Sequence, residues 1–148
     1  MDLTKSYPRS VRETVAGVVM LGRTADKAKA KLFGDIGEYH YNCPMDQAVF
    51  GFLGIDHEAF LEAVKNAKSD ADIEAYAKTF AAKKTPAEIE HWNAEFLKYK
   101  PAPGSDSETY FLDLRNQVAP DRTDVVAWAD LLDLDEKREV PRRTAAAV

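Results

Sequence analysis

The sequence predicts an all-α fold, a compact single-domain bundle of about seven or eight short helices with no significant sheet. Apolar side chains recur at helical spacing along most of the chain, and signals that start a helix precede most of these stretches. No pair of segments alternates as strands do. A chain of 148 residues can bury a core without a metal or a disulfide.

Local start signals place the helices. The predicted helices begin at Ser10, Thr24, Pro44, Asp56, Ser69, Thr85, Ser105 and about Asp124. In the Ser-X-X-Glu and Thr-X-X-Glu boxes, the two side chains satisfy free backbone N–H groups of the first turn. Proline fits the first helical position because its missing N–H has no helical partner there.

The first of these helices is predicted from a capping box followed by four valines. Val11, Val15, Val18 and Val19 follow the box at helical spacing, and the helix should end near Gly22. Valine is a poor helix former, so packing must hold this segment.

The next two helices have clear stops. In the second, Ala25, Ala28 and Leu32 should face inward, with Gly34 as its stop. The third should run from Pro44 to Gly54.

The predicted domain organisation is a single helical domain over residues 1–140 and a flexible C-terminal tail over 141–148. The break at residues 101–104 is too short for a domain linker.

Composition argues against several functional classes. A net charge of −5 and a pI near 5.2 argue against general nucleic-acid binding. The polar N-terminus lacks a signal-peptide core, and no apolar run is long enough for a membrane span, so a cytoplasmic protein is expected. One cysteine and three widely spaced histidines offer no local metal motif, and no cofactor-binding motif is present.

Arg23, Lys27 and Lys31 recur at every fourth residue and should form a cationic stripe along the second helix. Such a run in an acidic protein suggests an anionic ligand or an acidic partner surface. The structural alternative is a solvated helix face whose positive charges are balanced by nearby carboxylates.

Residues 37–43 lack helical periodicity and form the clearest structured loop. Cys43 should lie at the N-cap of the helix that begins at Pro44, where free N–H groups favour a thiolate. Tyr39 and Tyr41 should point the same way and could donate hydrogen bonds to a bound group. The alternatives are a packed cysteine and tyrosines that cover the core.

Five segments resemble a small bacterial family of domains of unknown function, family 5069. They are residues 2–10, 26–31, 37–39, 43–46 and 52–56. The resemblance implies a bacterial single-domain protein and supplies no mechanism.

Together these patterns predict a pocket for a small anionic or polar molecule, framed by the loop and the basic helix. Arg23, Lys27 and Lys31 would bind the ligand. If the protein is an enzyme, Tyr39 or Tyr41 would donate a proton, and Cys43 would be the nucleophile or a polar residue of the pocket lining. The alternative is a non-catalytic interaction module that docks an acidic partner surface or forms a homo-oligomer through exposed aromatic residues.

Overall fold

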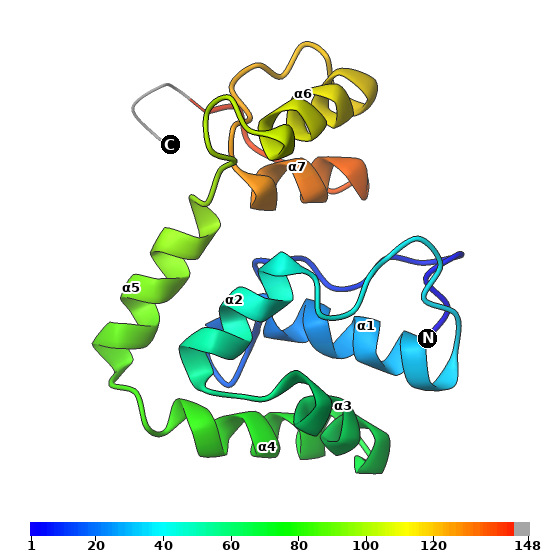
Figure 1. Ribbon diagram of the computed structural model, residues 1–148, viewed down its shortest axis with the longest axis vertical. Helices are drawn as coiled ribbons and strands as arrows, with labels where there is room; N and C mark the ends of the chain where they lie inside the picture. Colours follow the sequence, from blue (N-terminus) through cyan, green and yellow to red (C-terminus); the bar gives the residue numbers. More distant parts are fainter. Residues whose placement is uncertain (144–148) are drawn as a thin grey trace. The chain divides into compact units, whose positions relative to one another are not determined.

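The computed structural model describes residues 1–143 and confirms a mostly α-helical fold (Figure 1). Its elements are β1 (Thr14–Val15), β2 (Val18–Val19), α1 (Leu21–Phe33), α2 (Pro44–Leu53), α3 (His57–Asn66), α4 (Asp70–Ala81), α5 (Pro86–Leu97), α6 (Asp106–Val118) and α7 (Trp128–Asp135). Contacts divide the chain into two compact units, Met1–Asn93 and Ala94–Val148.

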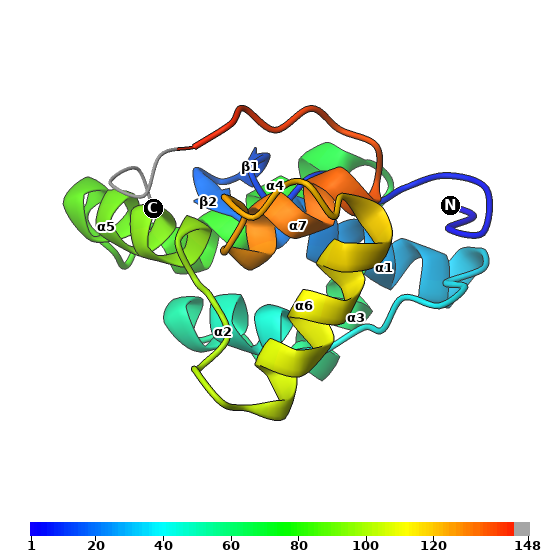
Figure 2. The ribbon, with the colours of Figure 1, turned by 90° about the horizontal axis from the view of Figure 1, so that it is seen from above.

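The predicted helix from Ser10 to Gly22 is wrong. This segment instead forms an antiparallel hairpin in which Thr14 pairs with Val19 and Val15 with Val18 (Figure 2). The Ser10 capping interaction does form, because the Ser10 backbone N–H donates to Glu13 Oε2 at 3.0 Å, but only a single turn follows it.

Backbone conformation explains why this segment forms a hairpin and not a helix. Ala16 and Gly17 lie between the strands with φ angles of 55° and 79°. Two positive φ angles are typical of the tight turn that matches the twist of paired strands. The β-branched valines favour extended backbone and are buried at three of these strand positions, Val15, Val18 and Val19.

Ala16 is an unfavourable residue for this turn, so Ala16→Asn is expected to raise the free energy of unfolding by about 0.5 to 1 kcal/mol. Asparagine tolerates positive φ better than alanine does. Urea denaturation of both proteins measures the difference, with Gly17→Ala as the opposite change that should destabilise the turn. A destabilised Ala16→Asn protein would contradict this turn geometry.

Helix α1 is the central element of the first unit and packs against the hairpin, α2 and α3. It begins at Leu21, three residues before the predicted cap Thr24, and every residue from Leu21 to Ala28 is buried. Gly34 ends the helix as expected. A side chain at Gly34 would collide with the Met1 backbone, because an added Cβ would lie 2.0 Å from its carbonyl oxygen.

Helices α2 and α3 pack against α1, α4 packs against α3, and a row of aromatic rings joins α2, α3 and α4. Phe60 is fully buried, with its ring centroid 5.2 Å from that of Phe50 and 6.2 Å from that of Tyr76. The predicted boundaries between these helices are confirmed. Gly54 ends α2 in the left-handed conformation, and the Asp56 side chain accepts from the Ala59 N–H to cap α3.

Asn93 connects α5 to the hairpin within the first unit. Its Nδ2 donates to the Gly17 carbonyl at 2.8 Å, and its Oδ1 accepts from the Val19 N–H at 3.1 Å. The neighbouring Trp92 stacks on Phe52, with the two ring centroids 4.8 Å apart.

The second unit has a small core between α6 and α7, which lie side by side (Figures 1 and 2). Phe111, Val125 and Leu131 form this core. Helix α7 begins at Trp128, four residues later than predicted, because residues 124–127 form a turn and an extended stretch.

Residues 141–143 of the predicted flexible tail make specific contacts. Arg143 forms two hydrogen bonds with Asp130, at 2.6 and 3.0 Å, and its backbone N–H donates to Asp124. Hydrogen bonds from Arg122 and Arg143 lower the pKa of Asp124 below its ordinary value. Residues 144–148 of the predicted tail lie outside the described residues.

Candidate functional site

A buried polar cluster connects α1 to the start of α2. Lys27 Nζ lies 2.8 Å from Asp46 Oδ2, and the two side chains are 4% and 0% exposed. Asp46 also accepts from the Thr24 hydroxyl at 2.6 Å and from the Cys43 backbone N–H at 3.2 Å. Each of these donors compensates part of the cost of burying the carboxylate.

Cys43 lies at the N-cap of α2, as the sequence predicts. Its half-buried side chain accepts from the Asp46 backbone N–H and lies 3.3 Å from Lys27 Nζ. Lys27 also donates to the His40 carbonyl at 3.0 Å. The ammonium group therefore connects the loop, the thiol and the buried carboxylate.

The three cations of the predicted stripe have different environments. Arg23 is buried, donates to the Arg9 carbonyl, and lies over the ring of Tyr39 at 5.5 Å from its centroid. Lys27 is buried in the ion pair with Asp46. Lys31 is exposed. The structure thus pairs Arg23 with Tyr39 and Lys27 with Cys43, and it does not present the stripe as an exposed face.

Tyr41 connects the loop to the start of α3. Its hydroxyl donates to the His57 carbonyl at 2.6 Å, and its ring makes an edge contact with Phe50. Burial, together with the charges of Asp46 and Asp56, raises the pKa of Tyr41 above its ordinary value. Tyr41 therefore holds its proton firmly and fixes the position of the loop.

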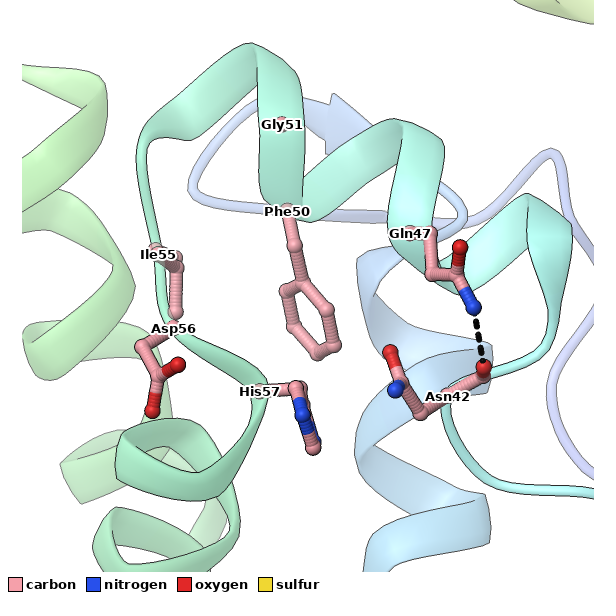
Figure 3. A pocket seen from close by; sticks show the side chains of 7 residues that line it. All are labelled: Asn42, Gln47, Phe50, Gly51, Ile55, Asp56 and His57. Atoms are coloured by element: carbon pink, nitrogen blue, oxygen red, sulfur yellow. Dashed lines mark hydrogen bonds between the residues drawn. The ribbon is translucent and has the colours of Figure 1, made fainter.

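The two residues that Tyr41 contacts, Phe50 and His57, line an open pocket of about 430 Å³ (Figure 3). It is lined by Asn42, Gln47, Phe50, Gly51, Ile55, Asp56 and His57. Phe50 and Ile55 are buried and supply an apolar floor. The side chains of Asn42, Phe50 and His57 point from three segments toward a common space.

The polar side chains around this pocket include groups with spare hydrogen-bonding capacity. Within residues 1–143, the Asn42 amide and the His57 imidazole make no hydrogen bond to the protein. Gln47 Nε2 donates to the Asn42 carbonyl at 2.9 Å, which supports Asn42 in a left-handed conformation with φ of 63°. Asparagine is one of the few residues that adopt this conformation readily.

The pocket residues were missed by sequence reasoning, which assigned no role to Gln47, Phe50 or His57. The relevant signals are Gly54, which turns the chain after α2, and Asp56, which starts α3 directly afterwards. This short connection brings His57 back toward Asn42, fifteen positions earlier in the chain. Neither this pocket nor the second one is lined by any of the six predicted site residues.

A second open pocket, of about 650 Å³, has a different character. It lies beside the hairpin turn and the connection between α4 and α5, and Ala81, Pro86 and Ile89 contribute to its lining. With few polar groups turned toward it, this pocket offers little to orient a small polar ligand.

In the part of the chain that the structure describes, no helix is long and apolar enough to cross a membrane.

No curated protein matches the sequence. The profile of the family described as "Domain of unknown function (DUF5069)" matches residues 5–138, which is most of the chain. Lys27 and Asp46, which form the buried ion pair, lie in two of the segments that carry the resemblance. The chain therefore belongs to this family of unknown function.

Proposed function

We propose that the first unit binds a small, polar, uncharged molecule in the pocket between Asn42 and His57. The observation that carries this proposal is the presence of an unused amide and an unused imidazole over an apolar floor. Ligand sites commonly combine an apolar surface with a few convergent polar groups. The volume of about 430 Å³ lies within the range of small-molecule pockets.

The pocket chemistry favours a polar ligand over an anionic one. Its lining contains Asp56 and no lysine or arginine. The cations that would have held an anion, Arg23 and Lys27, are buried in contacts with Tyr39 and Asp46. A ligand with amide, hydroxyl or heterocyclic groups could stack on Phe50 and bond to Asn42 and His57.

The alternative of an interaction module that docks an acidic surface has less support. It relies on the same stripe, of which only Lys31 is exposed.

A cytoplasmic, bacterial setting is part of the proposal. The single free cysteine fits a reducing compartment, and the resemblance to a bacterial family supports the source.

Binding can be tested by NMR titration with neutral amide, hydroxyl and heterocyclic fragments, alongside inorganic phosphate and acetate. We expect saturable shifts of the Asn42, Gln47 and His57 resonances with the neutral fragments. Asn42→Gly keeps the left-handed backbone accessible and removes the amide, so it should weaken binding by about tenfold, the effect of one lost hydrogen bond.

Gln117→Ala is the control for that titration, because Gln117 lies exposed on α6 in the other unit and should leave binding unchanged. If no neutral fragment shifts the pocket resonances, the proposal fails. Phosphate binding at these residues in preference to the neutral fragments would show that the ligand is anionic.

A further inference from the structure

Lys27 and Cys43 form a close amine–thiol pair outside the pocket. Lys27 Nζ lies 3.3 Å from Cys43 Sγ, although the residues are sixteen positions apart. The ammonium has three N–H donors, and acceptors lie at the His40 carbonyl, the sulfur and the Asp46 carboxylate. The nitrogen is therefore held beside the sulfur by two further contacts.

Two hydrogen-bond donors lie beside the sulfur of Cys43. Cys43 Sγ accepts from the Asp46 backbone N–H and lies next to the Lys27 ammonium. Donors and a positive charge stabilise the anionic form of a thiol, which is the form that peroxides oxidise. Because Cys43 is half-buried, a small oxidant can reach it, while Lys27 is buried directly beside it.

We propose that this pair is a site of oxidative modification, at which hydrogen peroxide joins Cys43 Sγ to Lys27 Nζ through a single oxygen atom. The observation that carries the proposal is the fixed 3.3 Å approach of the amine nitrogen to the sulfur. One inserted oxygen spans such a gap with little movement of α1 or the loop.

The reaction consumes two molecules of peroxide. In the first step the sulfur attacks peroxide, an S–O bond forms, the O–O bond breaks, and Cys43 becomes a sulfenic acid with release of one water. In the second step the sulfenic oxygen bonds to the Lys27 nitrogen as another peroxide is reduced and two waters leave. One thiol, one amine and two peroxides thus give one N–O–S linkage and three waters.

Asp46 can assist the second step. The amine must lose its extra proton before it forms the new bond, and Asp46 Oδ2, at 2.8 Å, is the nearest acceptor. The linkage would remove the positive charge of Lys27 and tie residue 43, at the end of the loop, covalently to α1. A thiol reductant should reverse the linkage by reducing the S–O bond.

The test is mass spectrometry of the native protein after treatment with hydrogen peroxide. We expect a mass gain of one oxygen less two hydrogens, which dithiothreitol reverses. Trypsin should yield the peptide 24–29, uncut after Lys27, joined to the peptide 32–65. The same treatment in denaturant, where the two residues are apart, should yield no joined peptide.

Lys29→Arg is the matched control and should still form the linkage, whereas Lys27→Arg should abolish it. Lys27 is buried, so the native-protein measurement decides the question even if Lys27→Arg fails to fold. The proposal would be overturned if the Cys43 peptide gained only the mass of one or more complete oxygen atoms and the Lys27 peptide stayed unlinked. A native thiol that peroxide leaves unchanged would overturn it as well.

Discussion

Replacing Asp46 by alanine is expected to lower the free energy of unfolding of the first unit by about 3 to 5 kcal/mol. The change leaves the Lys27 ammonium buried without its carboxylate and removes the acceptor for the Thr24 hydroxyl. A buried charge without a partner is far more costly than a missing surface ion pair. Chemical denaturation followed by circular dichroism measures the loss.

Asp106→Ala is the matched control for Asp46→Ala. Both aspartates lie in the first turn of a helix, but Asp106 is exposed, so its loss should change stability by no more than about 0.5 kcal/mol. A double variant, Asp46→Leu with Lys27→Met, should recover much of the stability that Asp46→Ala loses, because an apolar pair can replace a buried ion pair. Equal effects at Asp46 and Asp106 would mean that the ion pair is open to water.

Replacing Phe60 by alanine should cost about 3 to 5 kcal/mol of unfolding free energy. Phe60 is fully buried between Phe50 and Tyr76, so truncation leaves a cavity that rigid neighbouring rings cannot fill. Phe33→Ala is the control, since Phe33 is 64% exposed and its loss should change little. If the two variants unfold at the same denaturant concentration, the aromatic row is not the core of this unit.

The helix starts at Pro44, Asp56, Ser69, Thr85 and Ser105 could be predicted from the sequence because their causes are local. The box at Thr85 forms both of its hydrogen bonds, with Glu88 Oε1 accepting from the Thr85 N–H and Thr85 Oγ1 from the Glu88 N–H, each at 3.1 Å. The hairpin could not be predicted in the same way. Its valines have a spacing that also fits a helical face, and the Ala16–Gly17 turn lacks the usual asparagine.

The candidate site shows the same division between local and distant causes. The position of Cys43 at the N-cap follows from the proline after it and was predicted. The pairing of Lys27 with Asp46 depends on where residues 37–43 place the start of α2, which spacing along α1 does not reveal. The three charges were therefore predicted to bind a ligand together, although the fold buries two of them in contacts with the protein itself.

The bonds from Asn93 to the hairpin have a consequence for the order in which the chain folds during synthesis. Residues 17 and 19 acquire these partners only after some seventy further residues have been made. At roughly 5 to 20 residues per second, the ribosome takes several seconds to supply Asn93. During that interval the buried valines of the strands lack part of their final support. The hairpin is thus a part of the first unit whose completion waits for α5.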